Sequence, residues 1–177
     1  MWKKALLAIA GLLAGLGAFV ASRDGHYRVQ RSMTFKAPPD KVYALISDFQ
    51  EFGQWSPWEK LDPAMKKEFS GTMGEVGAEY RWQGNNKVGE GKMTILAVEP
   101  QRRVDMSLEF IKPFASVCTT RYELKSEGDT TTMTWSMEGE NKSFMEKLFG
   151  VLMNMEKMIG ADFERGLSNL KDRLGDR

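Results

Sequence analysis

The last third of the chain carries apolar residues at alternating steps of three and four, which is the spacing of one face of an α-helix. The residues that keep this spacing are Met145, Leu148, Leu152, Met155, Ile159, Phe163, Leu167, Leu170 and Leu174. Ser143 and Glu146 stand in the arrangement of a capping box, in which each side chain accepts a hydrogen bond from an amide at the helix start. The pattern predicts one continuous helix of about eight turns over residues 143–174.

The first half of this predicted helix is more apolar than a single buried stripe requires. The additional apolar residues are Phe149, Val151, Met153 and Met158. We expect this surplus to be buried against another part of the molecule, whereas an exposed patch between Phe144 and Met158 would indicate dimerisation. Gly150, Gly160 and Gly166 each weaken a helix by about 1 kcal/mol, so we also expect the helix to flex locally.

Residues 66–141 have the alternation of half-buried β-strands. The apolar faces are formed by Ala78, Tyr80 and Trp82, by Met93, Ile95 and Ala97, by Val104, Met106, Leu108 and Phe110, and by Met133, Trp135 and Met137. Turn-forming residues separate them at Gly84-Asn85-Asn86, Pro100-Gln101, Lys112-Pro113 and Glu127-Gly128-Asp129. Such short connections favour antiparallel neighbours, so we expect an α+β fold in which a curved sheet of about seven strands wraps the final helix.

The sequence before these strands predicts an opening strand and a helix. Residues 27–35 alternate as a strand does, although Arg31 interrupts the apolar face. A helix is expected from Pro39 to near Asp48, because apolar residues there share one helical face. The next segment is expected to be irregular, and its indoles, Trp55 and Trp58, either plug the sheet or form the rim of a pocket.

Length and charge restrict the class of protein. A chain of 177 residues with 42% apolar content can form one ordinary domain. Beyond residue 22 the chain has 23 basic and 24 acidic residues, and this near-neutrality argues against nucleic-acid binding. The single cysteine, Cys118, excludes an internal disulfide and is expected to be a small buried core residue.

Residues 1–22 form a separate segment from the domain expected over residues 23–177. After Lys3 and Lys4, the run from Ala5 to Ala21 is uncharged and spans roughly 26 Å as a helix, close to the thickness of a bilayer core. We expect a retained membrane anchor, placed in a bacterial inner membrane with the domain on the periplasmic side. The alternative is an exported protein whose signal peptide is cleaved near Ser22. Similar basic charges on both sides of the run leave the orientation weakly determined.

Several motifs resemble one known superfamily, the helix-grip proteins related to START domains and Bet v 1, in the branch named for polyketide cyclases and dehydrases. The motifs are Tyr27-Arg28-Val29-Gln30-Arg31-Ser32, Ala37-Pro38-Pro39-Asp40-Lys41-Val42, Trp55-Ser56-Pro57-Trp58, residues 71–77, Trp135-Ser136-Met137-Glu138-Gly139 and residues 158–167. The resemblance covers residues 27–174. It implies a deep apolar cavity between the sheet and the terminal helix, which relatives use for lipids, quinones, sterols or polyketides.

The main functional hypothesis is therefore a membrane-tethered binding module for a hydrophobic small molecule, held between the sheet and the helix over residues 143–174. The proposed wall residues are Trp58, Tyr80, Trp82, Met93, Met106, Phe110, Trp135, Met137, Met155 and Ile159. Methionine suits such a wall because its side chain is flexible and polarizable. Each of these residues taken singly is also typical of an ordinary core, and a stress-response or interaction module without a ligand remains an alternative.

A cyclase or dehydratase is the enzymatic alternative, with Asp162 or Tyr80 as the proton-transfer group. Asp162 lies at the edge of the apolar face of the final helix, where pairing with Arg81 or Arg121, or simple solvation, would be the ordinary role of an acid. The only histidine, His26, lies beside the apolar N-terminal segment and has no evident nucleophilic partner. No cluster has metal-ligand spacing, so we expect no metal and no cofactor. The oligomeric state is left open.

Overall fold

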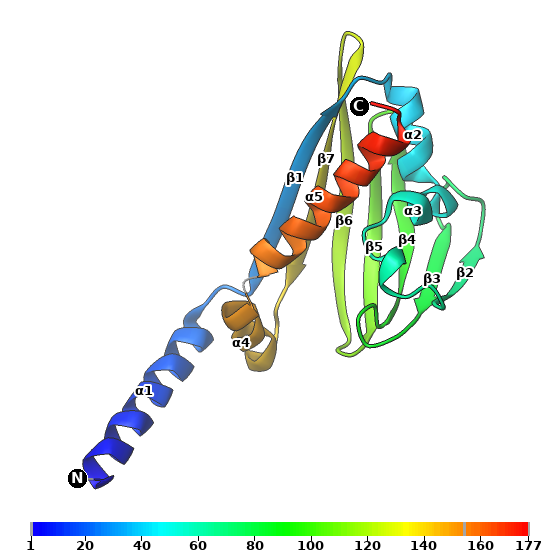
Figure 1. The fold of residues 1–177 in the computed structure, drawn as a ribbon. Helices are drawn as coiled ribbons and strands as arrows, with labels where there is room; N and C mark the ends of the chain where they lie inside the picture. Colours follow the sequence, from blue (N-terminus) through cyan, green and yellow to red (C-terminus); the bar gives the residue numbers. More distant parts are fainter. Residues whose placement is uncertain (1, 154, 177) are drawn as a thin grey trace.

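A computed structural model describes residues 2–153 and 155–176, and within them the expected sheet is present (Figure 1). Seven antiparallel strands form one sheet in the order β1-β7-β6-β5-β4-β3-β2. The strands are β1 His26–Phe35, β2 Lys66–Ser70, β3 Glu79–Gln83, β4 Glu90–Glu99, β5 Arg103–Lys112, β6 Ser116–Glu127 and β7 Thr130–Glu140. The named turns separate the strands as predicted, and alternation located β1, β3, β4, β5 and β7. No apolar face had been inferred for β2 or β6.

The helices that accompany this curved sheet are α1 Trp2–Ser22, α2 Pro39–Ser47, α3 Phe49–Trp55, the short 3₁₀ helix η1 Glu59–Leu61, α4 Phe144–Met153 and α5 Met155–Arg173. Helices α2, α3 and α5 lie on one face of the sheet, whereas α1 and α4 lie beyond one of its ends (Figure 1). In Figure 1, α5 crosses the concave face of the sheet, α2 and α3 lie beside its C-terminal end, and α1 projects away from the other end. The arrangement confirms the α+β class and the sheet gripping a C-terminal helix.

In place of the single helix predicted over residues 143–174, the structure describes two helices, α4 and α5, on either side of residue 154, which lies outside the described residues. The capping box itself is confirmed: the Ser143 amide donates to the Glu146 carboxylate at 2.9 Å, and the Glu146 amide donates to Ser143 Oγ at 3.2 Å. Helix α4 contacts α1, whereas α5 contacts β1, and Figure 1 shows the two helices on different axes. The surplus apolar residues were expected to be buried, but Val151 on α4 is 38% exposed and Met158 on α5 is 45% exposed, so that expectation is wrong for these two. The side chains of Phe149 and Met153 lie outside the described part of the structure.

Residues 49–55 form helix α3 instead of the irregular segment predicted there. Asp48 is extended, which ends α2, and its side chain then accepts a hydrogen bond from the Gln50 amide at 2.7 Å. An acidic N-cap of this kind satisfies a free amide of the first turn and starts a new helix. The helical pair brings Trp55 into the core, where its indole donates to the Leu45 carbonyl at 2.9 Å.

Arg31, which interrupts the apolar face of the first strand, ties that strand to α5. Its guanidinium lies 2.6 Å from the Glu164 carboxylate and 2.8 Å from that of Glu156. Closer to the C-terminal end, Asn169 donates to the Trp55 carbonyl at 3.0 Å, which joins α5 to α3. Polar contacts at both ends therefore hold α5 across the sheet.

Gly166 allows α5 to approach the sheet closely. A Cβ atom added there would lie 2.7 Å from the Trp135 ring and 3.2 Å from Pro57 Cδ, both of which are tightly packed groups. At Gly160, by contrast, the added atom would meet the end of the Arg31 side chain, which can move. The sequence predicted that these glycines make the helix flexible. At Gly166 the structure instead shows that a side chain would collide with the Trp135 ring, so close packing explains the glycine there.

We predict that Gly166→Ala destabilises the protein although alanine favours a helix. Overpacking costs about 1 to 3 kcal/mol, and this outweighs the gain of about 1 kcal/mol in helix propensity. Gly160→Ala is the comparison variant and should cost less, because it displaces the Arg31 side chain and weakens only ion pairs with the exposed Glu156 and Glu164. Urea unfolding of the two variants measures the difference, and equal stability would show that α5 has room to shift.

Candidate functional site

Nine of the ten predicted wall residues belong to one hydrophobic core. Five are buried and four are partly buried: the buried ones are Tyr80, Met93, Met106, Trp135 and Met137, and the partly buried ones are Trp58, Trp82, Phe110 and Ile159. The tenth, Met155, begins α5, but its side chain lies outside the described part of the structure. The structure thus brings the described residues together on the concave face.

One half of the concave face is filled by aromatic side chains. Phe163 of α5 stacks on Trp135 of β7 with ring centroids 4.0 Å apart. Trp55 of α3 packs edge-on against Trp135 at 5.5 Å, and Tyr122 of β6 lies 5.9 Å from Trp55. Trp55 was expected either to plug the sheet or to rim a pocket, and the geometry shows that it plugs the sheet.

Several apolar side chains packed against this core are only partly buried. We call five of them the half-buried apolar group: Trp58, which packs edge-on against Trp135, and Trp82, Leu108, Phe110 and Ile159. Trp82 lies flat on the sheet, because Gly91 on β4 has no side chain to hold its ring away, and it meets Phe110 edge-on at 6.1 Å. Sequence reasoning placed Leu108 on the apolar face of its strand but did not name it as a site residue.

Two hollows among the described residues lie at the β3 and β4 end of the sheet, away from α5. One has a volume of about 330 Å³ and the other of about 240 Å³. The first is lined by Gln83, Gly84, Asn85, Asn86, Gly89, Glu90, Lys112 and Pro113. The second shares Gln83 and Glu90 with it and borders Trp82 of the half-buried apolar group. The walls of both are largely polar, which differs from the deep apolar cavity that the family resemblance implies.

Asp162 is held by protein partners. It accepts a hydrogen bond from the Trp58 indole at 3.3 Å and pairs with Arg165 on the next turn of α5. The expected alternatives, Arg81 and Arg121, are wrong, because Arg81 pairs with Glu79 and Arg121 with Asp105. Asp162 therefore fixes Trp58 against α5 at the edge of the half-buried apolar group.

Tyr80 is also engaged. Its hydroxyl donates to the Glu59 carboxylate at 3.1 Å, and Lys67 pairs with the same carboxylate at 2.7 Å. Burial, followed by the nearby Glu59 charge, raises the pKa of Tyr80 well above its ordinary value. The phenol therefore stays protonated as a hydrogen-bond donor, a state that does not suit a proton acceptor.

The remaining chemistry-bearing residues offer no further centre among the described residues. His26 is exposed at the start of β1, and its amide donates to Asp24. Within residues 2–153 and 155–176, no group of three histidine, cysteine, aspartate or glutamate side chains is placed to hold a metal ion.

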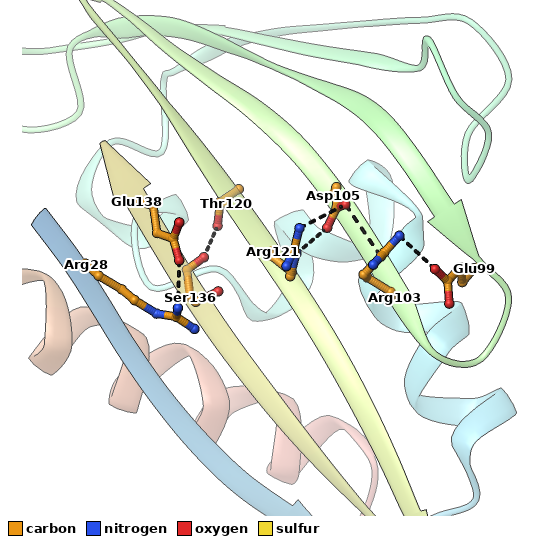
Figure 2. A network of polar contacts seen from close by, with 8 residues as sticks. All are labelled: Arg28, Glu99, Arg103, Asp105, Thr120, Arg121, Ser136 and Glu138. Carbon is orange, nitrogen blue, oxygen red and sulfur yellow. Dashed lines mark hydrogen bonds and ion pairs between the residues drawn. The ribbon is translucent and has the colours of Figure 1, made fainter. Parts of the chain in front are cut away.

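The convex face of the sheet is polar. Figure 2 shows the Arg121 guanidinium between β6 and β5, where its Nε lies 2.6 Å from Asp105. Arg103 extends the row towards Glu99, and Arg28 pairs with Glu138 at 2.9 Å at the β1 edge. Solvated ion pairs of this kind contribute little stability and mark a water-facing surface.

The sequence matches, over residues 26–175, the family described as polyketide cyclase / dehydrase and lipid transport. The chain therefore belongs to this family, and the family together with the fold supports binding of a hydrophobic small molecule. A comparison with curated proteins gave no match.

Solved structures share the fold. A protein from Nitrosospira multiformis is 25% identical with a TM-score of 0.60, and the alignment covers 84% of this chain and 96% of that one. Ara h 8.0201 is 13% identical with a TM-score of 0.62, with coverage of 86% and 100%. DynU16, a protein in the dynemicin biosynthetic locus, is 18% identical with a TM-score of 0.60, covering 84% of this chain and 47% of DynU16. These likenesses confirm the Bet v 1-like helix-grip fold.

We predict that Tyr122→Phe stabilises the protein. The Tyr122 hydroxyl is fully buried without a hydrogen-bond partner among the described residues, and such an unsatisfied group costs about 1 to 3 kcal/mol. Removing it should raise the melting temperature by about 2 to 4 °C for each kcal/mol recovered, as measured by calorimetry. A lower melting temperature would mean that a molecule outside the chain satisfies the hydroxyl.

We predict that Cys118 does not react with thiol reagents in the folded protein. The side chain is buried, and burial raises the pKa of its thiol to about 11. The reactive thiolate is therefore scarce near neutral pH. Labelling should occur only after unfolding in guanidinium, and rapid labelling of the native protein would show that this end of β6 opens.

Proposed function

We propose that this protein is a membrane-tethered module that holds a lipid-, quinone- or polyketide-like molecule against the half-buried apolar group. The observation that supports it is the uneven cover of the concave face, which is filled by Trp55, Trp135 and Phe163 on one side and left partly open at Trp82 and Phe110 on the other. Partly exposed apolar surface gains about 25 cal/mol for each Å² that a guest covers.

The proposed guest is mainly apolar and has one polar end. The half-buried apolar group supplies aliphatic and aromatic contacts from β3, β5, α5 and the segment before η1. The Asp162 and Arg165 pair borders this surface through Trp58, so it is the nearest place for a hydroxyl or carbonyl of the guest to find hydrogen-bond partners. The polar end therefore faces α5, and the apolar body lies on the sheet.

Helix α1 is proposed as the tether, with residues 1–22 as the anchor and residues 23–177 as the binding domain. Helix α1 is long and apolar enough to cross a membrane, and only 7% of its most apolar window is buried within the molecule. A signal sequence has the same properties, so retention of this segment in the mature protein is part of the proposal.

The ligand proposal can be tested by filling the half-buried apolar group. In Leu108→Trp the larger ring should occupy the place of the guest, whereas Leu96→Trp, on an exposed position of the neighbouring strand, is the matched control. Native mass spectrometry of the full chain in a detergent micelle should find a bound hydrophobic molecule in wild type and in Leu96→Trp. Leu108→Trp should lose at least about tenfold in occupancy, which corresponds to about 1.4 kcal/mol.

Thermal unfolding of both variants shows whether each remains folded. Equal occupancy in all three folded proteins would place the guest elsewhere, and no bound molecule in any of them would favour a module whose apolar face is covered only by its own side chains.

A further inference from the structure

Helix α4 presents an apolar surface that the described part of the molecule leaves uncovered. Phe144 is 47% exposed, Met145 56% and Val151 38%, and Met158 at the start of α5 is 45% exposed. On α4, Phe144, Met145 and Val151 fall within about 120° of the helix circumference at 100° per residue. Residues 148–153 carry no charge. We call these four exposed residues the α4 patch.

The start of α4 is fixed to the end of α1. Lys147 Nζ donates to the Arg23 carbonyl at 2.9 Å, and the Asn141 amide donates to the Gly25 carbonyl at 2.8 Å. Helix α4 also contacts α1 itself, and α1 ends at Ser22, directly before this junction (Figure 1). The α4 patch therefore lies beside the point at which the apolar N-terminal helix ends.

The length of α1 sets the level of this junction relative to a bilayer. A helix of 21 residues is about 32 Å long, close to the thickness of a hydrocarbon core of about 30 Å. A bilayer that surrounds α1 along its length therefore ends near Ser22, which places α4 at the boundary between acyl chains and head groups. An amphipathic helix at that level typically buries its apolar face about 5 to 10 Å deep.

We propose that α4 is a second membrane-binding element, which lies in the interface with the α4 patch against lipid acyl chains. This inference rests on the proposed function, because it requires α1 to cross the membrane. We take the bilayer, and not a second copy of the chain, as the partner of the α4 patch. The reason is that α4 contacts α1, and the proposed function already places α1 in lipid along its length.

Charge does not account for the contact. Arg23, Lys142 and Lys147 stand at the junction together with Asp24 and Glu146, so the basic residues are largely balanced. The Glu146 carboxylate accepts from the Lys142 and Ser143 amides as part of the helix cap. The inferred binding is therefore apolar and should occur on zwitterionic phosphatidylcholine without anionic lipid.

The test measures the depth of single side chains in the full chain reconstituted into phosphatidylcholine vesicles. Met145→Cys and Val151→Cys are each labelled with an environment-sensitive fluorophore, and buried Cys118 stays unlabelled at neutral pH. Leu12→Cys reports on the α1 span. Val76→Cys is the control, because it is exposed in the β2–β3 connection and β2 is the edge strand farthest from β1.

Brominated lipids should quench the probes at 145 and 151 by at least about twofold, because bromine must lie within the acyl-chain region that the helix enters. The probe at 12 should also be quenched, and the probe at 76 should be unaffected. Quenching at 12 without quenching at 145 and 151 overturns the role of α4 but leaves the tether intact. Absence of quenching at 12 overturns the tether and the inference together.

A further outcome would also overturn the proposal. If the emission of the probe at 145 is blue-shifted but not quenched, and Met145→Cys cross-links two chains, a second copy covers the α4 patch. Melting curves of the labelled proteins identify any variant that has lost its fold. If a cysteine variant is unfolded, Met145→Ser or Val151→Ser is used in its place, and the assay then measures protease cleavage at residues 141–147 of the vesicle-bound protein. Faster cleavage of either serine variant than of wild type supports docking, and equal rates contradict it.

Discussion

The close packing of α5 against β7 is the contact on which the rest of the structure depends. The Trp135 and Phe163 rings lie 4.0 Å apart, and Gly166 leaves space for the indole one turn farther along. Ring stacking at this distance requires the helix backbone to lie close to the sheet, and only a small residue permits it. The same contact draws Trp55 of α3 into the core, so one half of the concave face is filled before any guest is considered.

The sequence predicted the sheet well, because strand alternation is a local property. The apolar faces inferred from period two are inward faces in the structure except at Ala97, because a bulge after Ile95 places Ala97 opposite Asp105 and turns Val98 to the core instead. The capping box at Ser143 and Glu146 formed as expected. Helix α3 was missed because a single N-cap residue, Asp48, starts it within a short segment. The different neighbours of α4 and α5 were missed for another reason. Periodicity reports that residues share a face, but it does not report which neighbour that face contacts, and α4 turns towards α1 while α5 follows the sheet.

The candidate site was predicted in part. The sequence identified which residues point to the concave face of the sheet. It did not predict that aromatic side chains fill one half of this face, because those rings come from segments far apart in the sequence. Trp55 and Tyr122 are examples, since nothing near either residue indicates that their rings meet. Arg31 was recognised only as an interruption of an apolar face, and its ion pairs with Glu156 and Glu164 on α5 are a finding of the structure.

The connection between α1 and the sheet consists only of residues 23–25, and it is pinned on both sides by hydrogen bonds to Asn141 and Lys147. Even fully extended, so short a link reaches about 10 Å. A domain attached in this way has little freedom to swing or to travel towards an opposing membrane. If α1 is a membrane tether as proposed, the domain can exchange a guest only with the membrane leaflet beside it. This arrangement suits extraction of a molecule from that leaflet, or its presentation there, better than transport over a distance.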